Sequence, residues 1–566
     1  MWVLRQSPKS LRTGRLVSHR HFHLTPRCLN DAVKPYYVTT PIFYPNSVPH
    51  IGHLYTVVVG DIFARHAKLV NPERPVYFVN GTDEHGLKIQ KAAKDKGLEP
   101  LVFCDQLNVF FRDLVEKANA NVTTFARTSE AKHYDSVQHL WKKMEEKGRI
   151  YKGKHEGWYS ISDECFYTSA QVTEVKTDSD TIYIATETGN RVEWSEEENY
   201  KFRLSAFTEP LLAHYKAHPD SIYPPQHYMD IVSTLASGPL DDLSVSRPKS
   251  RLSWGIPVPG DDDHTIYVWI DALTTYLSAS GYPWSTEQAL FDNGWPPNLQ
   301  VIGKDILRFH AIYFPAMLMA LDLPLPQQLL SHSHWTVNQR KMSKSIGNVV
   351  NPIQAIDEFG VDVVRYYLAR VGGRFKDDID WSQSQVEKHS REIMSTLGNL
   401  YSRISSKKIQ DRVAPSEVNE DLYEKHKATI LAPLLAHLET LKSRYASNME
   451  KLQVADVLDD IMATLQEANV LMTQTAPWSS STEATVVTSV TVTIIESLRI
   501  CGILLQPFIP GKAEQLLNGL SIPTNERSLT YAEVGKGPKI PTIQGGIRLF
   551  EKLKGSQETP PRKGNK

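Results

Sequence analysis

Two histidines, His50 and His53, stand where a predicted strand ends and a predicted helix begins. Residues 37–42 are mostly β-branched or aromatic, which favours a buried strand, and the apolar periodic segment from Ile51 favours a helix. A helix N-terminus offers free N–H groups and a partial positive charge to a phosphate. Two imidazoles beside Gly52 would add donors there, although a pair of structural histidines explains this short pattern equally well.

Two lysines, Lys341 and Lys344, flank small and flexible residues in a stretch with little apolar anchoring. Such a loop can bring positive charge to a phosphate, although a lone pair of lysines is more often a solvated basic turn. The histidine and lysine patterns are about 290 residues apart, which leaves room for a complete doubly wound domain between them. Together they predict a phosphate site built from two distant segments.

Short apolar strands alternate with amphipathic helices from Tyr36 onward, which predicts a doubly wound parallel sheet with ligand sites at the carboxyl ends of its strands. After Pro352 the chain becomes helical, and its amphipathic segments predict a bundle. The fold class is therefore α/β, followed by an α-helical domain. The expected later strands are 75–80, 265–270, 299–303 and 329–333, and the expected helical segments are 355–370 and several between 386 and 520.

Length and composition limit the class of protein. A chain of 566 residues predicts three or four domains. Its 63 basic and 64 acidic residues nearly cancel, so any polyanion must be bound by local basic patches. Four scattered cysteines without a CxxC pair exclude a disulfide framework and the usual zinc ribbons, and they fit a reducing compartment. No apolar run reaches the roughly 18 residues of a membrane span, so we expect no membrane partner.

Residues 1–30 carry six arginine or lysine residues and no acidic residue. This composition is typical of an organelle transit peptide, and a disordered basic tail is the alternative. Residues 20–25 resemble a mitochondrial processing site. We therefore expect cleavage near residue 30 and a location in the mitochondrial matrix.

The two phosphate-type patterns resemble the HIGH and KMSKS motifs of class I aminoacyl-tRNA synthetases, and the match narrows to the methionyl-tRNA synthetases. The resemblance covers residues 36–545. It implies activation of L-methionine with ATP, release of pyrophosphate, and transfer of methionine to the 3′ end of tRNA(Met). The segments that carry it are TTPIFYPNSVPHIGHLYT, NGTDEHGLKI, EENYKFRLS, YVWIDALTTY, IGKDILRFHAIYFPAML, KMSKSIGNV, TLGNLYSR and TAPW.

The resemblance also implies roles for individual residues. The catalytic groups would be His50, His53, Lys341 and Lys344. ATP would be bound by His50, Gly52, His53, Asp305, Lys341, Ser343 and Lys344. Methionine would be bound by Ile42, Tyr44, Asp83, Trp269, Ala272, Tyr276, Ile306 and His310. Within this set, Asp83 would bind the α-ammonium group, and Tyr44 with His310 could form a polar pair beside the sulfur.

Three positions depart from the bacterial pattern, namely Pro41, Leu273 and Phe314, and they leave the contour of the methionine pocket open. Without the family pattern, the aromatic members of the pocket would be interpreted as ordinary core residues.

The sequence predicts no protein-bound metal. Asp83, Glu84 and His85 are contiguous, and contiguous residues rarely converge on one ion. The charge-rich segment at about residues 146–228 is expected to be a small inserted domain, and this insertion contains a single cysteine, Cys165, so a site of four thiolates cannot form and we expect no structural zinc. Mg²⁺ is expected with ATP. At roughly 80 residues the insertion is also too small for the hydrolytic editing domain of the branched-chain enzymes.

For the anticodon, the resemblance points to Asn399, Arg403 and Trp478. The first two are four residues apart on one helical face, and the indole would stack on an unpaired base. A helix-capping core tryptophan is the alternative for Trp478.

The domain division follows from these assignments. The predicted segments are a presequence (1–30), the first half of the Rossmann catalytic domain (31–145), a connective insertion without zinc (146–235), the second half with the KMSKS loop (236–350), a stem-contact region (351–390), a helical anticodon-binding domain (391–545) and a polar tail (546–566). We expect a monomer. The alternative functions are those of another class I synthetase and of a catalytically silent tRNA-binding relative.

Overall fold

The computed structural model describes residues 33–162, 165–176, 181–342, 347–414, 420–538 and 542–551. The predicted presequence, Ser343 and Lys344 of the lysine loop, and most of the predicted polar tail lie outside the described residues.

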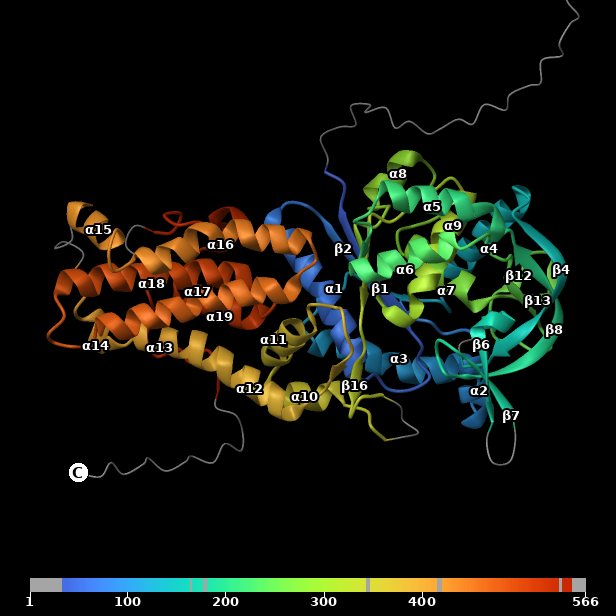
Figure 1. The fold of residues 1–566 in the computed structure, drawn as a ribbon, viewed down its shortest axis with the longest axis horizontal. Helices are drawn as coiled ribbons and strands as arrows, with labels where there is room; N and C mark the ends of the chain where they lie inside the picture. The colour runs from blue at the N-terminus through green and yellow to red at the C-terminus, as the bar shows by residue number, and fades with distance from the viewer. Residues whose placement is uncertain are drawn as a thin grey trace, which may run out of the picture. The chain divides into compact units, whose positions relative to one another are not determined.

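Six parallel strands form the central sheet in the order β3-β2-β1-β14-β15-β9, of which β1 and β2 are labelled in Figure 1. The order reverses between β1 and β14, which opens a crevice at the carboxyl ends of these two strands. The doubly wound sheet predicted from the sequence is confirmed. Its strands are β1 (Tyr36–Phe43), β2 (Val76–Thr82), β3 (Thr124–Arg127), β9 (Ile222–Tyr223), β14 (Leu299–Gly303) and β15 (Gln328–His332).

Helices cover both faces of this sheet. Because side chains alternate along a strand, Val38 enters the core that contains α1, whereas its neighbour Tyr37 enters the core that contains α4, α7 and α9. The helices of this half are α1 (Ile51–Val70), α2 (Leu87–Asp95), α3 (Pro100–Lys117), α4 (Ala131–Glu146), α5 (Thr208–Ala217), α6 (Pro225–Ala236), α7 (Val268–Ser278), α8 (Glu287–Asp292) and α9 (Phe314–Ala320).

The strand expected at 265–270 is wrong in its second half. Strand β13 ends at Ile266, Tyr267 is the N-cap, and α7 begins at Val268. This helix is buried on nearly every side, so it lacks the polar face from which a helical period is recognised.

The insertion folds around a second, antiparallel sheet in the order β5-β4-β8-β7-β6. Its strands are β4 (Ile150–Ser160), β5 (Cys165–Tyr167), β6 (Val172–Lys176), β7 (Thr181–Ala185) and β8 (Arg191–Phe202), with β10 (Leu243–Ser244) beside β8. Two small sheets complete the strands: β11 (Ser246–Pro248), β12 (Pro257–Val258) and β13 (Asp261–Ile266), and β16 (Trp335–Val337), β17 (Arg340–Lys341) and β18 (Ile379–Asp380).

The C-terminal part is helical, as predicted. The expected segment 355–370 is divided into two helices at Gly360, whose φ of 85° interrupts the first. The helices are α10 (Pro352–Phe359), α11 (Val361–Gly372), α12 (Gln383–Ile393), α13 (Asn399–Ile404), α14 (Lys407–Gln410), α15 (Glu420–Lys427), α16 (Ala432–Glu450), α17 (Val454–Thr475), α18 (Ala484–Leu505) and α19 (Pro510–Gly519).

Helix α18 is, within the described ranges, the single helix long and apolar enough to cross a membrane by length and composition. The sequence expectation that no such stretch exists is therefore wrong on this criterion, because Glu496 and Arg499 interrupt the apolar run without ending the helix. Of its most apolar window, 83% is buried inside the protein. Burial in the bundle core accounts for this composition.

A buried ion pair joins the bundle to α1. The Arg365 guanidinium in α11 lies 2.6 Å from the Asp61 carboxylate in α1, and both side chains are buried. The same guanidinium donates to the carbonyls of Pro507 and Phe508 at 2.8 and 3.1 Å. This buried charge pair fixes the two parts in one register, since removal of Asp61 would leave the buried Arg365 guanidinium without its carboxylate partner.

Candidate active site

The N-terminus of α1 is closed by two stacked imidazoles. The rings of His50 and His53 lie 3.9 Å apart between centroids, with an angle of 26° between their planes. The His50 Nδ1 accepts from the Gly52 N–H at 3.1 Å, and the His53 Nδ1 accepts from the His50 N–H at 3.0 Å. A Cβ atom at position 52 would lie 2.9 Å from the His50 ring, so this arrangement requires Gly52.

These caps determine where the imidazole protons are. Because each Nδ1 accepts a backbone hydrogen bond, a neutral His50 or His53 carries its proton on Nε2. Both rings line the main cavity at the crevice of the sheet. The helix end and the two Nε2–H groups are therefore suited to an anionic ligand.

The main cavity has a volume of about 1700 Å³. It is lined by every predicted site residue of the catalytic half outside the lysine loop. These residues are Ile42, Tyr44, His50, Gly52, His53, Asp83, Trp269, Ala272, Tyr276, Asp305, Ile306 and His310. They come from β1 and the residue after it, from the N-terminus of α1, from the loop after β2, from α7 and from the segment after β14, so the carboxyl ends of β1, β2 and β14 meet α1 and α7 around one space.

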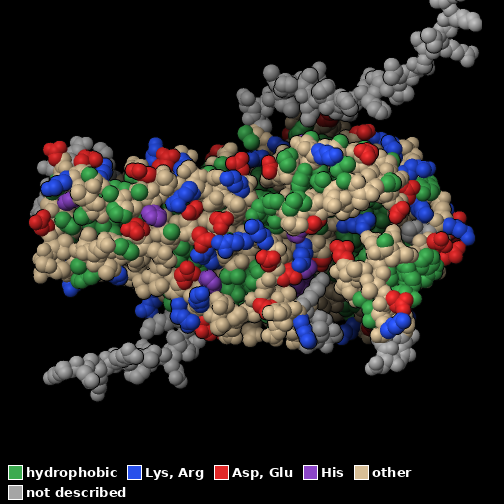
Figure 2. Space-filling view, viewed as in Figure 1, with side chains coloured by type: hydrophobic (Ala, Val, Ile, Leu, Met, Phe, Trp, Pro, Cys, Tyr) green, Lys and Arg blue, Asp and Glu red, His purple; other side chains and the backbone are tan. Residues whose placement is uncertain are grey.

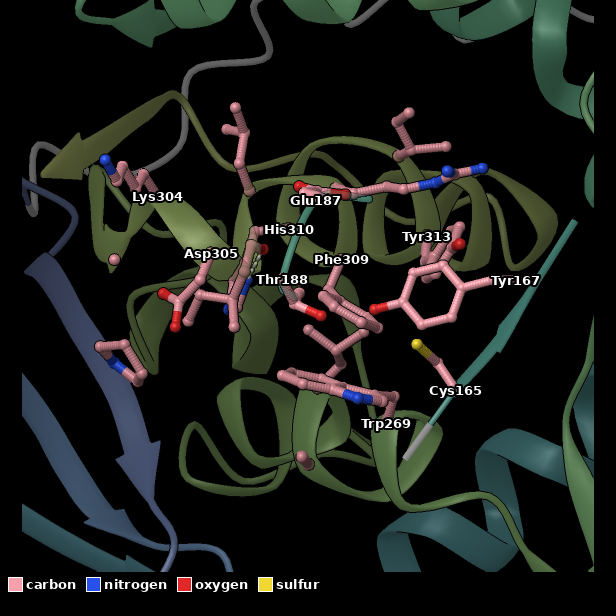
Figure 3. A pocket seen from close by; sticks show the side chains of 18 of the residues that line it. Cys165, Tyr167, Glu187, Thr188, Trp269, Lys304, Asp305, Phe309, His310 and Tyr313 are labelled. Atoms are coloured by element: carbon pink, nitrogen blue, oxygen red, sulfur yellow. Dashed lines mark hydrogen bonds between the residues drawn. The ribbon is translucent and has the colours of Figure 1, made fainter. Parts of the chain in front are cut away.

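Aromatic rings form one wall of the cavity (Figure 3). Trp269 stacks on Phe309 with 3.7 Å between ring centroids. The His310 Nε2 accepts from the Tyr276 hydroxyl at 2.7 Å, and its Nδ1–H donates to the Ile306 carbonyl at 3.0 Å. Both nitrogens of His310 are thus engaged, and Tyr276 is its side-chain partner in this wall.

Burial keeps His310 neutral. Desolvation lowers the pKa of His310 to about 4, because a charged imidazole would lose its hydration in this wall. The residue lies in a π-helical turn, Phe309–Tyr313, that continues into α9. Such turns are often found at functional sites because they shift the register of the side chains that follow.

The three contiguous residues Asp83, Glu84 and His85 point to different places. Asp83 is buried and lines the cavity. The Glu84 carboxylate accepts from the Arg127 Nε at 2.7 Å and from the Thr82 hydroxyl at 2.7 Å, away from the cavity. The His85 Nδ1 lies 2.6 Å from a carboxylate of α7. The three side chains thus point to three different sets of partners.

Asp305 and its neighbour Lys304, which both line the cavity, have partners that the sequence did not single out. The Asp305 carboxylate lies 3.1 Å from the His334 Nε2, and the Lys304 ammonium lies 2.8 Å from the Asp378 carboxylate. A Cβ atom at position 303 would lie 2.7 Å from the Asp305 Oδ1, so the close approach of this carboxylate depends on Gly303. Sequence periodicity carries no signal for such partners, since they come from three separate segments.

The insertion supplies another wall of the cavity. Figure 3 shows Cys165 and Tyr167 of β5 facing Trp269 and Phe309, and Glu187 with Thr188 approaching the same space. No group of three or more His, Cys, Asp or Glu side chains in the described part of the chain could hold a metal ion.

A smaller cavity of about 470 Å³ lies in the helical part. It is lined by the three residues predicted there, with Asn399 and Arg403 on α13 and Trp478 after α17. The Arg403 guanidinium lies over the Trp478 ring, 4.9 Å from its centroid. On the face shown in Figure 2, acidic and basic side chains are interspersed rather than gathered in one large basic patch, in keeping with the near-zero net charge.

Comparisons with known proteins agree with this arrangement. Residues 36–405 match the family of class I tRNA synthetases (M), and residues 425–550 match the anticodon binding domain of methionyl tRNA ligase. The probable mitochondrial methionine–tRNA ligase of Schizosaccharomyces pombe is 43% identical over 524 residues, covering 92% of this chain and 96% of that protein. The mitochondrial methionine–tRNA ligase of Homo sapiens is 40% identical over 513 residues, covering 87% of this chain and 85% of that protein.

A solved structure has the same fold. The crystal structure of the methionyl-tRNA synthetase of Mycobacterium tuberculosis bound by methionyl-adenylate superimposes with a TM-score of 0.83 at 36% identity, covering 92% of this chain and 100% of that chain.

Proposed function

The chain belongs to the methionyl-tRNA synthetase family of class I aminoacyl-tRNA synthetases, and we propose that it is a methionine–tRNA ligase. It activates L-methionine with ATP and then transfers methionine to the 3′ end of tRNA(Met). The observation that carries the proposal is the main cavity, in which the N-terminus of α1 and the aromatic wall of α7 line one space. That space is suited to an anionic and a thioether substrate together.

Activation is a nucleophilic displacement at the α-phosphorus of ATP. A carboxylate oxygen of methionine attacks the α-phosphorus of ATP, the bond from this phosphorus to the bridging oxygen breaks, and pyrophosphate leaves. No protein group forms a covalent bond, so the enzyme acts by positioning its substrates and by neutralising developing charge. In the second step a ribose hydroxyl of the tRNA attacks the methionyl carbonyl carbon, and AMP leaves.

The phosphates are assigned to the N-terminus of α1. The Nε2–H groups of His50 and His53, together with the backbone beside Gly52, would donate to phosphate oxygens. Asp305, which also lines the cavity, is assigned to the ATP site as well. From the family pattern, Lys341 and Lys344 would bring positive charge to the β- and γ-phosphates as the transition state forms, and Ser343 would add a hydroxyl donor to the ATP site.

Methionine is assigned to the aromatic wall. Asp83 would bind the α-ammonium group, since a buried carboxylate is its natural partner. The thioether would lie against Trp269 and Tyr276, where sulfur–ring contacts are favourable. The neutral His310 fits this apolar substrate because it presents no charge. Ile42, Tyr44, Ala272 and Ile306 complete the predicted contacts.

Mg²⁺ would accompany ATP and offset the charge of its phosphates. The described residues hold no cluster that could bind a metal by itself, so phosphate oxygens and water are its expected ligands. We also propose that the insertion folds without zinc. Stoichiometric zinc in the purified protein would contradict this part of the proposal.

The anticodon is assigned to the smaller cavity. Trp478 would stack on an unpaired base, and Asn399 and Arg403 would donate to base edges. The domain boundaries drawn from the sequence are part of the same proposal, as is a monomeric state, which light scattering of the purified protein would test.

The mitochondrial matrix is the proposed location, supported by relatives from two fungi and from mammals that are named mitochondrial. Protein isolated from mitochondria should begin near residue 30. An N-terminus still at Met1 would contradict the proposed cleavage.

One assay tests the catalytic proposal. ATP–pyrophosphate exchange should depend on methionine and on no other amino acid. Exchange with a different amino acid would favour another class I specificity, and no exchange with any of them, while tRNA still binds, would favour the silent relative.

A further inference from the structure

A buried carboxylate behind the main cavity takes no part in the steps above. Asp271 of α7 is 1% exposed and does not line the cavity. Its Oδ2 lies 2.6 Å from the His85 Nδ1, and its Oδ1 lies 2.7 Å from the His133 Nε2. One carboxylate therefore holds two imidazoles, one on each oxygen.

Each imidazole has a second partner on its other nitrogen. The His85 Nε2 lies 2.9 Å from the Tyr134 hydroxyl, and the His133 Nδ1 lies 2.8 Å from the Ser278 hydroxyl. The contacts link three elements: the loop after β2, which carries His85; α4, which carries His133 and Tyr134; and α7, which carries Asp271 and Ser278. We call this set the Asp271 clamp.

Burial alone would raise the pKa of the Asp271 carboxyl, yet the adjacent His85 and His133 hold it below its ordinary value. The carboxylate is therefore ionised and accepts from both rings. Charge-assisted hydrogen bonds of this kind are shorter and roughly twice as strong as neutral ones, and a buried partner left unsatisfied is costly. The clamp thus restrains the positions of the loop and of α7.

The clamp lies between the two ends of the methionine site. His85 is two residues after Asp83, the residue assigned to the ammonium group. Asp271 lies on α7 between Trp269 and Ala272, which are assigned to the side chain of methionine. A shift of either segment would change the separation of the two subsites.

We propose that Asp271, His85 and His133 are positioning residues that set the distance between Asp83 and the α7 wall and so determine the affinity for methionine. The proposal rests on the proposed function, because it assumes that methionine binds between Asp83 and α7. It adds residues that touch no substrate.

Because Asp271 contacts Nε2 of His133 but Nδ1 of His85, the same two substitutions should have opposite effects at the two positions. An asparagine amide nitrogen reaches about as far as an imidazole Nδ1, and that of glutamine about as far as Nε2. At position 133 the contact with Asp271 is made by Nε2, so His133→Gln retains it and His133→Asn loses it. At position 85 the contact is made by Nδ1, so His85→Asn retains it and His85→Gln loses it.

We expect the two variants that lose the contact to show a KM for methionine about tenfold higher than their matched partners, the scale of one buried charge-assisted hydrogen bond. The KM for ATP and the exchange rate at saturating methionine should differ less than threefold within each pair. The longer glutamine keeps the contact at position 133, whereas the shorter asparagine keeps it at position 85. A general packing defect would favour the same side-chain length at both positions and so cannot produce this pattern.

Equal methionine KM values within both pairs would overturn the proposal, as would a change confined to thermal unfolding temperature. Failure of the proposed function itself would look different, because the unaltered protein would then show no methionine-dependent exchange.

Discussion

The two cavities of the protein are built in different ways. In the main cavity, His310 and Asp83 are buried, and the rings of His50 and His53 are fixed by backbone hydrogen bonds. In the smaller cavity, Asn399 is exposed and Trp478 is only partly buried. A reaction gains from groups that are already oriented in a site of low dielectric, whereas an unpaired base can stack on a half-exposed ring.

One feature is common to both regions. A π-helical turn, Met394–Gly398, joins α12 to α13 just before Asn399, and the π-helical turn Phe309–Tyr313 contains His310. In each case the extra residue rotates the side chains that follow. The cavities thus differ in burial but use the same local device to aim side chains.

The largest effect should come from the α1 end of the main cavity. An asparagine at position 50 can still accept from the Gly52 N–H and cap α1, but it lacks the Nε2–H donor. We expect His50→Asn to slow adenylate formation about 10²- to 10³-fold, the scale of one lost transition-state donor. Pre-steady-state pyrophosphate release measures this rate, and thermal unfolding should confirm that the helix cap is kept. An unchanged rate would show that the oriented imidazole is not needed.

A substitution in the smaller cavity should impair the charging of tRNA but leave the activation of methionine unchanged. Trp478→Ala should reduce the charging of tRNA about 5- to 150-fold, the range for loss of one stacked base. ATP–pyrophosphate exchange should stay the same, because the ring is remote from the main cavity. Trp478→Phe keeps an aromatic face and serves as the matched control. Intact charging in the alanine variant would make Trp478 a structural residue.

Acid should affect the two regions unequally. Burial lowers the pKa of His310 and of His332 to about 4, below their unfolded value of about 6.5. The unfolded state therefore binds more protons as pH falls from 6.5 towards 4, and stability is lost over that window, by about 2 kcal/mol for each histidine at pH 5. Within the described ranges, all histidines whose pKa burial clearly lowers belong to the catalytic half: His66, His139, His214, His227, His310 and His332.

Hydrogen exchange at pH 5 and pH 7, corrected for intrinsic rates, measures this difference. Protection should fall in β14 and α7 and remain in α17. Equal loss of protection in the catalytic half and in the helical C-terminal part would contradict the expected difference in acid sensitivity.

The smallest effect concerns the arginine over the indole. Arg403→Lys keeps the charge but loses the planar face and fork of the guanidinium. An exposed cation–π contact is worth about 0.5–1 kcal/mol, so charging should fall only about 2- to 5-fold. A loss as large as that of Trp478→Ala would mean that Arg403 reads the base itself.

The sequence alone predicts those parts of the site in which short motifs carry a local signal. The strand and helix around His50 and His53, and the face shared by Asn399 and Arg403, follow from periodicity and turn chemistry. Knowledge of the family pattern added the wall residues, since nothing local distinguishes Trp269 or Tyr276 from a core aromatic.

The rest depends on contacts between distant segments. The stack of Phe309 on Trp269 and the clamp of Asp271 by His85 and His133 each join residues more than 30 positions apart. The sequence predicts a strand for the first turn of α7, Val268–Ile270, because burial on nearly every side removes the polar face from which a helix is recognised. Tertiary packing, rather than propensity, decides such elements.

The strand order has a consequence for how the protein folds. The central strand β1 pairs with β14, and their partner residues Val38 and Leu299 are about 260 positions apart. Until the second of these strands is available, one edge of β1 presents unpaired backbone groups, which are a template for aggregation. The catalytic half is therefore expected to fold slowly and late, and its early chain would depend on molecular chaperones until residues 299–303 arrive.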